Sequence, residues 1–323
     1  MVVEYTNGIT VRGIDLWLDP RTRKDLAVVS HAHMDHVARH GAIIASPGTA
    51  RLCAHRLGEV RTQVLRFGEP AAAGRGRITL LPAGHMLGSA QILLELDGRS
   101  LLYSGDFKVR PGETAEPLEV RHADILVMEC TYGRPQYLFP PRDEVLEGIG
   151  RFIRRSFAAG AVPILLVYAL GKGQEVAKLL GDRGYRVALH RSIYEGVRVY
   201  EEFGVKFTGY ERYDGQRLDD TVLLAPPGAE RSLLLRAIPR KRRALLTGWA
   251  LDGRPKGGIE AAFPLSDHAD FRDLLWYVEQ VRPKLVYTLH GFDEEFARQL
   301  LRRGVRARPL RARTQLLLFH DLT

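Results

Sequence analysis

The amino-acid sequence predicts an α/β protein in which a small parallel α/β unit interrupts a layered, strand-rich domain. Two observations indicate the layered domain. Short apolar strands alternate with polar, histidine-bearing loops up to about residue 135, and the same pattern returns from residue 263. A third observation indicates the insertion, because strands and helices alternate between residues 140 and 260. We therefore assign residues 1–140 and 261–323 to one domain and residues 141–260 to the inserted one.

The N-terminal part of the chain contains most of the expected strands. Two or three short strands are expected in residues 1–30, the last of them in the apolar run 26–29. Ser46 is a suitable N-cap and Pro47 a suitable first helical residue, so we expect a helix from there to about residue 57. Further strands are expected at 42–45, 64–67, 78–81, 91–96 and 100–103, with an Asp97-Gly98 hairpin turn between the last two.

The middle of the chain has the order of elements typical of a parallel α/β unit. Val145, Ile149 and Phe152 recur at helical spacing and predict a helix over 143–159. The other expected elements here are strands at 162–168, 185–189, 221–225 and 244–247 and helices at 174–180 and 194–203. A basic run, Arg236 and 240–243, comes just before the last of these strands and suits either a solvated surface or phosphate contact. After the insertion we expect helices at 271–281 and 294–301 and strands at 285–289 and 315–319.

Composition narrows the class of protein without deciding its function. The chain has 323 residues, a net charge of +9 and 45% hydrophobic residues, which suits a globular protein with a substantial core. The positive charge favours an anionic partner such as nucleic acid, although a merely basic surface would give the same count. No apolar run approaches the roughly 18 residues of a membrane span, and the N-terminus has no signal-peptide pattern. With two cysteines, Cys53 and Cys130, a reducing cytoplasm is expected.

The densest group of potential metal ligands follows the strand at 26–29. His31, His33, Asp35 and His36 fall within six residues, directly after an expected buried strand. Imidazole and carboxylate ligands together favour zinc, with manganese or iron as alternatives. A histidine-rich surface loop without metal is the competing interpretation. Because a strand end holds such a loop in place, we predict a metal centre.

Other polar side chains follow strand ends elsewhere in the chain, and they belong to the same pattern. His85 lies in a glycine-rich loop at 82–90, Asp106 follows the strand at 100–103, and Glu129 ends an apolar run. His268 precedes the helix at 271–281, and His290 follows the strand at 285–289. Loops at strand ends on one edge of a layered sheet converge, so these side chains are expected to share one site.

Together these residues resemble the motifs of a known superfamily. The run from His31 to His36 resembles the H-x-H-x-D-H signature of the metallo-β-lactamase superfamily. Glu129, His268 and His290 resemble motifs A, B and C of its β-CASP branch of nucleases, and the resemblance covers essentially the whole chain. The short length and phrases such as 168–172 and 265–270 are most similar to the bacterial DNA ligase-associated exonuclease group. The implied fold is an αββα sandwich carrying an inserted β-CASP domain.

The resemblance also implies roles for individual residues. One Zn²⁺ would be held by His31, His33 and His85, and a second by Asp35, His36 and His290, with Asp106 bridging the two and Mn²⁺ as a possible substitute. A metal-bridged hydroxide would attack the phosphodiester, and Asp35 would thus serve catalysis as well as metal binding. His268, positioned by Glu129, would donate a proton to the leaving group, although it could instead cap the following helix. Asp19 would orient the metal loop from outside the ligand shell.

The turn at Gly171 and Lys172 is a weaker candidate site for a substrate phosphate. It lies between an expected strand and helix, where backbone amides and a lysine favour anions. Such turns are common in α/β units, and the spacing of a nucleotide P-loop is missing.

The favoured function is that of a zinc-dependent nuclease, a DNA exonuclease acting in DNA repair, with DNA ligase or helicase as possible partners. The main alternative is an RNA-processing ribonuclease similar to RNase J or to the polyadenylation endonuclease. A histidine at position 290 matches RNA-cleaving members as well as the ligase-associated group, so it does not separate the two. Less favoured are a non-catalytic nucleic-acid-binding scaffold and a small-molecule hydrolase such as a lactonase or thioesterase. The filled ligand positions argue against the former, and the insertion, Glu129 and His268 against the latter.

Overall fold

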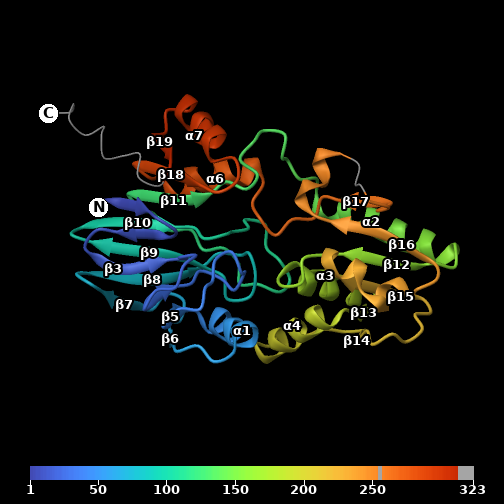
Figure 1. Ribbon diagram of the computed structural model, residues 1–323. Coiled ribbons are helices and arrows are strands. Elements are labelled where there is room, and N and C mark those ends of the chain that lie inside the picture. The colour runs from blue at the N-terminus through green and yellow to red at the C-terminus, as the bar shows by residue number, and fades with distance from the viewer. Residues whose placement is uncertain (254–256, 312–323) are drawn as a thin grey trace. The chain divides into compact units, whose positions relative to one another are not determined.

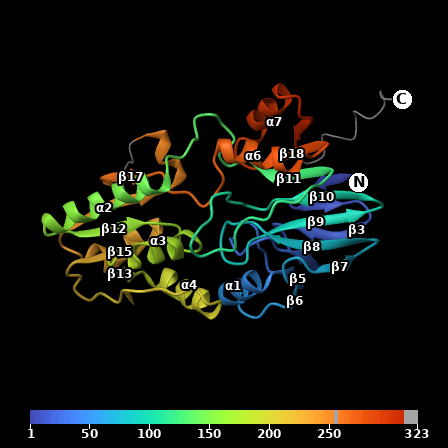
Figure 2. The ribbon, with the colours of Figure 1, turned by 180° about the vertical axis from the view of Figure 1, so that it is seen from behind.

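A computed structural model describes residues 1–253 and 257–311, and these residues form two compact units (Figures 1 and 2). Unit 1 comprises Met1–Pro111, Ala115–Pro135 and the chain from His268 on, and unit 2 comprises Gly112–Thr114 and Gln136–Asp267. The chain thus leaves unit 1 and later returns to it. The assignment of the two units as an interrupted domain and an inserted domain, with boundaries at 140 and 260, stays a prediction.

The first sheet of unit 1 is built from strands in sequence order. Strands from β3 onward pair in parallel, which brings the carboxyl ends of β4 and β5 to one edge. Helix α1 (Pro47–Leu57) begins after Ser46, whose hydroxyl accepts a hydrogen bond from the Thr49 amide, as the N-cap prediction required. The strands are β1 (Val3–Tyr5), β2 (Ile9–Val11), β3 (Ile14–Leu18), β4 (Leu26–Val28), β5 (Ala42–Ala45) and β6 (Thr62–Val64).

The second sheet of unit 1 has the order β19-β18-β11-β10-β9-β8-β7. Asp97 and Gly98 join β9 to β10 with φ of 50° and 70°, which is the conformation of the predicted hairpin turn. Strand β11 lies inside this sheet and pairs in parallel with β10 on one side and with β18 on the other. The strands are β7 (Pro70–Ala73), β8 (Gly76–Pro82), β9 (Ala90–Leu96), β10 (Arg99–Tyr103), β11 (Ile125–Glu129), β18 (Leu285–Leu289) and β19 (Ala307–Pro309).

Unit 1 is layered as the fold class requires. One core lies between its two sheets and contains Leu18, Ile78 and Val127, among others. A second core fills the space between the second sheet and helices α6 (Phe271–Val281) and α7 (Asp293–Arg302), which cover it (Figure 1). Helix α1 packs beside β5 and β6. The αββα sandwich is therefore confirmed. Within the described residues, no helix combines the length and the apolar character that crossing a bilayer requires.

Unit 2 contains one parallel sheet in the order β14-β13-β15-β12-β16-β17. Apolar side chains of α2, α3 and α4 cover one face, and those of η1 and α5 lie against the other. This is the small parallel α/β unit that the sequence predicts, and the prediction is confirmed. Its strands are β12 (Val162–Leu166), β13 (Arg186–Leu189), β14 (Tyr210–Arg212), β15 (Thr221–Ala225), β16 (Lys241–Leu246) and β17 (Ala261–Phe263). Its helices are α2 (Arg142–Ala158), α3 (Lys172–Gly181), α4 (Arg191–Glu202), η1 (Pro227–Arg231), α5 (Leu233–Arg236) and η2 (Gly248–Asp252).

Several expected elements differ from those observed. The strand expected at 64–67 is displaced to β6, and the short strands β7, β14, β17 and β19 were not predicted. Most of the basic run lies inside β16 rather than before it, because ion pairs of Arg242 with Glu260 and of Arg243 with Glu230 accommodate these charges in a strand. The strand expected at 315–319 lies outside the described residues.

Candidate metal centre

The histidine-rich loop begins where β4 ends, at the edge of the first sheet. Strand β4 stops at Val28, and the loop carries the His31, His33 and His36 side chains into the protein, where each is at most 6% exposed. The fourth member, Asp35, has a side chain that is 63% exposed. The loop therefore buries its three imidazoles together, which is costly for imidazoles unless their nitrogens find partners.

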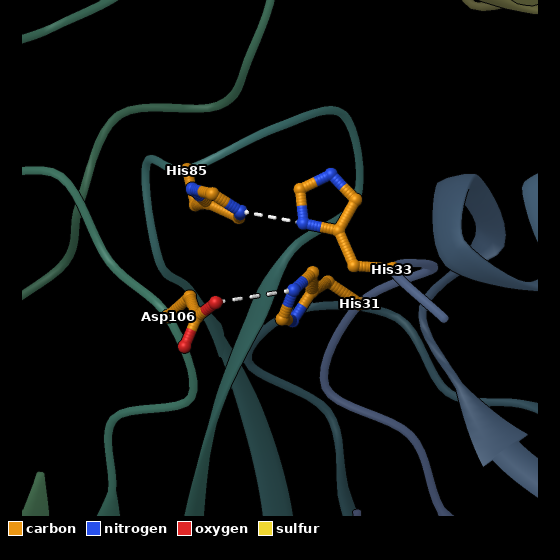
Figure 3. A group of neighbouring side chains, drawn as sticks. All are labelled: His31, His33, His85 and Asp106. Atoms are coloured by element: carbon orange, nitrogen blue, oxygen red, sulfur yellow. Dashed lines mark hydrogen bonds and ion pairs between the residues drawn. The ribbon is translucent and has the colours of Figure 1, made fainter. Parts of the chain in front are cut away.

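One group of ligand atoms comes from three different loops of unit 1 (Figure 3). His31, His33, His85 and Asp106 each offer one atom, and these atoms lie within 4.8 Å of one another. His85 Nε2 lies 3.2 Å from His33 Nδ1, and His31 Nε2 lies 3.5 Å from an Asp106 carboxylate oxygen. The sequence prediction that the loops at 31–36, 82–90 and 104–107 converge is thus matched by the geometry.

The hydrogen bonds around His31 leave one of its nitrogens suited to a metal. The Ser30 hydroxyl donates to Asp19, so its oxygen accepts from His31 Nδ1 at 3.0 Å, which places the lone pair on Nε2. Within residues 1–253 and 257–311, that Nε2 is buried without a hydrogen-bond partner. Burial, reinforced by the charge of His36, lowers the pKa of His31 well below its usual value, so the ring is neutral. A neutral, oriented imidazole with a buried lone pair fits a zinc ligand.

A second group of predicted ligands lies next to the first, also around Asp106. His36 Nε2 is 3.4 Å from an Asp106 oxygen and 3.8 Å from an Asp35 oxygen. The His290 ring centroid lies 5.7 Å from that of His36, and Asp35, His36 and His290 line one small pocket. Asp106 therefore contacts both His31 and His36, as a bridging carboxylate would. Asp35 and His290 lie near His36, but these two side chains are less tightly clustered than those of His31, His33, His85 and Asp106.

Asp19 connects this second group to the protein interior. Its carboxylate accepts hydrogen bonds from the Ser30 amide at 2.7 Å, the Ser30 hydroxyl, His36 Nδ1 at 2.8 Å and the Tyr103 hydroxyl at 2.9 Å. Burial alone would lower the pKa of His36, but Asp106 and Asp19 outweigh it and raise that pKa well above its usual value. With Nδ1 donating to Asp19, His36 presents Nε2 to Asp106. The role of Asp19 in orienting the metal loop stays a prediction, and this hydrogen bond is the contact through which it would act.

His268 and Glu129 form a hydrogen-bonded pair beside the candidate metal ligands. His268 Nδ1 lies 2.9 Å from a Glu129 oxygen, and Glu129 is almost fully buried and also accepts from the Phe107 amide at 3.0 Å. Atoms of Asp106, Glu129 and His268 lie within 4.8 Å of one another. The His268 ring centroid is 4.7 Å from that of His85. Its side chain is 19% exposed and therefore accessible from solvent.

The alternative role of His268 as a helix cap is taken by another residue. Asp270 is the N-cap of α6, and its carboxylate accepts a hydrogen bond from the Asp273 amide at 2.9 Å. An ion pair with Arg110 at 2.7 Å holds Asp270 in place. His268 is therefore not needed to begin the helix.

The predicted phosphate contacts lie in unit 2, at the start of α3. Lys172 is 8% exposed, and its Nζ lies 2.9 Å from Asp267 in an ion pair. The Gly171 amide donates to Gln174 Oε1 at 2.7 Å. A phosphate here would meet a lysine that already has a carboxylate partner, so the contact stays a prediction.

Two residues of the site were not found from the sequence. Tyr103, at the end of β10, donates to Asp19, and Thr131 donates its hydroxyl to Glu129. Thr131 lies two residues after Glu129, so its proximity could have been noticed. The sequence around Tyr103 does not indicate that its hydroxyl donates to Asp19, which follows a strand of the other sheet.

Comparison with known proteins identifies the class to which this fold and site belong. Residues 15–157 match a β-lactamase superfamily domain, and residues 260–308 match a Zn-dependent metallo-hydrolase RNA specificity domain. The chain belongs to the metallo-β-lactamase superfamily, within its β-CASP branch.

Similar proteins include enzymes named for DNA and for RNA. A probable DNA ligase of Opitutus terrae is 45% identical over 94% of this chain and 30% of its own length. The 5′ exonuclease Apollo of Gallus gallus is 33% identical over 60% of this chain and 45% of its own length. An RNase J-like protein of Methanocaldococcus jannaschii is 27% identical over 49% of this chain and 44% of its own length. The chain thus spans less than half the length of each of these relatives.

Proposed function

We propose that this protein is a zinc-dependent nuclease that hydrolyses phosphodiester bonds of nucleic acid, and that it is a DNA exonuclease acting in DNA repair. One observation carries the proposal: the Nε2 atoms of His31 and His36, both oriented through Asp19 and Ser30, converge on Asp106 in a buried site. This is the arrangement expected of a two-metal hydrolase rather than of a single structural ion.

Seven residues would hold the metals. His31, His33 and His85 would bind one ion and Asp35, His36 and His290 the other, with Asp106 between them. Zn²⁺ suits this donor set best, and Mn²⁺ is the alternative. When bound, two such ions polarise a phosphoryl oxygen and make water a better nucleophile at neutral pH.

The pair of His268 and Glu129 would assist departure of the leaving group. Because the Nδ1 proton of His268 is donated to Glu129, the other ring nitrogen is the one available for proton transfer. The Glu129 carboxylate stabilises the charged imidazolium, and the charge is needed at the moment when an alkoxide leaves. A positioned acid of this kind contributes about 10²- to 10⁴-fold to turnover.

DNA is the favoured substrate because of the relatives and the charge of the chain. Nearly the whole chain aligns with a segment of a protein named as a probable DNA ligase, and another relative is named a 5′ exonuclease. The net charge of +9 suits a polyanionic substrate. The ligase relative also supports a DNA ligase as a partner of this chain, and a helicase is the other partner we propose.

RNA is the second candidate substrate, on a specific observation. Residues 260–308, which contain His268 and His290, match a domain named for RNA specificity, and one relative is named RNase J-like. An RNA-processing ribonuclease would use the same metal-binding residues.

End-labelled oligonucleotides test both candidates in one experiment. Single- and double-stranded DNA and RNA with 5′-phosphate, 5′-hydroxyl or blocked 3′ ends are incubated with the Zn²⁺- or Mn²⁺-loaded protein. We expect stepwise shortening of DNA from one end. His268→Ala should lose about 10²- to 10⁴-fold in turnover at unchanged metal content. His55→Ala, at the exposed end of α1, is the matched control and should behave as wild type.

The outcomes separate the possibilities clearly. Degradation of RNA but not DNA would replace the DNA proposal by the RNA one. Loss of metal together with activity in His268→Ala would make His268 a ligand or a structural residue. A loaded wild-type protein that cleaves none of these substrates would refute the nuclease proposal.

A further inference from the structure

Two exposed aromatic side chains follow neighbouring strands of the unit 2 sheet. Strands β12 and β16 pair in parallel, with Leu166 opposite Leu245, so the loops after them leave the same edge. Tyr168 follows β12 and is 45% exposed, and Trp249 follows β16 and is 43% exposed. The carboxyl edge of a parallel sheet is where α/β units bind ligands.

The Trp249 ring is held in place by a buried partner. The rings of Tyr137 and Trp249 are 5.5 Å apart between centroids and nearly perpendicular, at 87°. Tyr137 is 3% exposed, and its hydroxyl donates to Asp252 at 2.8 Å, in the same 3₁₀ helix, η2, that carries Trp249. Because the two rings are nearly perpendicular, Tyr137 covers at most one face of the indole ring. The contact with Tyr137 also restricts rotation of the Trp249 side chain.

The backbone at this position is also fixed. Thr247 is the N-cap of η2, and its hydroxyl accepts from the Trp249 amide at 3.4 Å. The Thr247 amide donates to the carbonyl of Phe263 at 3.0 Å, at the end of β17, the strand that leads toward His268 in the sequence. Single exposed apolar residues are ordinary on protein surfaces. Trp249 differs from such residues because hydrogen bonds fix its backbone and the contact with Tyr137 fixes its ring.

We propose that Trp249 is a stacking platform for an unpaired nucleobase of the substrate, with Tyr168 as a second ring on the adjacent loop. This proposal rests on the proposed nuclease function and specifies its substrate as nucleic acid that is single-stranded where it contacts unit 2. A base in a duplex already has both faces stacked, whereas an unpaired base has a face to offer. Stacking tolerates any base, so it suits an enzyme that shortens a strand regardless of sequence.

Kinetics on single-stranded oligonucleotides test the platform directly. Trp249→Ala should raise KM about 5- to 150-fold, the factor that one base–aromatic stack represents, with kcat at saturation unchanged. Trp249→Phe, which keeps a ring, should recover most of the affinity. Trp276→Ala is the matched control, because Trp276 is a 39% exposed tryptophan on α6, and its KM should equal that of wild type. Unchanged thermal midpoints show that the variants fold.

Abasic substrates identify the stacking partner. Moving one abasic residue along the oligonucleotide should raise the wild-type KM at a particular position, and at that position it should add nothing to the Trp249→Ala defect, because both changes remove the same contact. Binding of a non-cleavable phosphorothioate strand, followed by anisotropy, gives the same comparison without catalysis. The platform can thus be refuted while the nuclease function stands, and the reverse also holds.

Two results would overturn the proposal. One is a Trp249→Ala variant whose KM and strand affinity equal those of Trp276→Ala, as expected if the surface docks a protein instead. The other is that the rise in KM caused by Trp249→Ala is fully additive with the rise caused by an abasic residue, whichever position of the oligonucleotide is made abasic.

Discussion

Replacing Asp19 by asparagine isolates what this carboxylate does for the proposed metal ligands. Its Oδ1 accepts from the Ser30 amide, and its Oδ2 accepts from the Ser30 hydroxyl, His36 Nδ1 and Tyr103. If the new amide nitrogen takes the Oδ2 position, it donates to His36 and forces the proton of that ring onto Nε2. If the amide is flipped, its NH₂ group faces the Ser30 N–H across 2.7 Å, donor against donor.

The first arrangement is the less costly, and its effect on metal binding can be estimated. Nε2 is the atom that His36 directs at Asp106, 3.4 Å away, and a protonated Nε2 cannot ligate. The ring must then break its new hydrogen bond and change tautomer before it binds metal. Such outer partners of metal ligands are typically worth about 10- to 100-fold in affinity. That factor corresponds to about 1.4–2.8 kcal/mol.

A competitive titration with a chromophoric zinc chelator measures this loss. Asp19→Asn should weaken the ion that His36 holds by the stated factor, and nuclease activity should be restored by added Zn²⁺. Tyr103→Phe is the matched control, because it removes one hydrogen bond to Asp19 but leaves the carboxylate to orient His36. It should lower the free energy of unfolding by about 1.5–3 kcal/mol while zinc affinity is retained. Wild-type affinity in Asp19→Asn, or equal weakening in both variants, would refute the tautomer argument.

Three further predictions concern other parts of unit 1. Glu129→Gln should lower turnover in the oligonucleotide assay while metal content, measured by elemental analysis, stays at the wild-type level; a joint loss would contradict the proposed role. Gly88→Ala should lower the thermal midpoint far more than Gly98→Ala, since both glycines have φ near +70° but only at Gly88 would the new Cβ lie 2.4 Å from a backbone nitrogen. Equal losses in thermal midpoint would show that the backbone conformation alone, and not the close contact of the new Cβ, determines the destabilisation. Burial raises the pKa of the Cys53 thiol to about 12 and that of Cys130 well above its usual value, so neither should react with Ellman's reagent at pH 8 before unfolding, and rapid native labelling would disprove this.

Local signals in the sequence were enough to predict the main elements of the fold. Helix α6 and strand β18 have the bounds expected from the apolar pattern, and α1 begins at the predicted cap. The parallel sheet of unit 2 followed from the alternation of strands and helices. Edge strands such as β14 were missed because a three-residue strand that is largely exposed has no hydrophobic pattern. The basic residues of β16 were misplaced because their acidic partners lie far away in the sequence.

In the candidate site, too, features with a local sequence signal could be predicted, and features that depend on distant residues could not. Its candidate ligands could be located in the sequence because each follows a strand, so the spacing and residue types are visible locally. The orientation of the ligands could not be predicted, because it depends on contacts across the fold. Tyr103 and Asp19 meet although 84 positions separate them. The sequence predicts that Lys172 contacts a phosphate, and only the folded chain shows the ion pair of Lys172 with Asp267.

The pairing of β11 with β18 has a consequence for how this protein is made. These two strands are neighbours in the second sheet, yet residues 136–267, which make up nearly all of unit 2, are synthesised between them. Until the ribosome has translated β18, β11 presents an open edge, which is a hazard for aggregation that chaperones must cover. His268 and His290 also emerge late. A chain that is released early therefore lacks both His268 and His290. If the proposed nuclease function is correct, such a prematurely terminated copy would be unable to cut the nucleic acid of the cell that makes it.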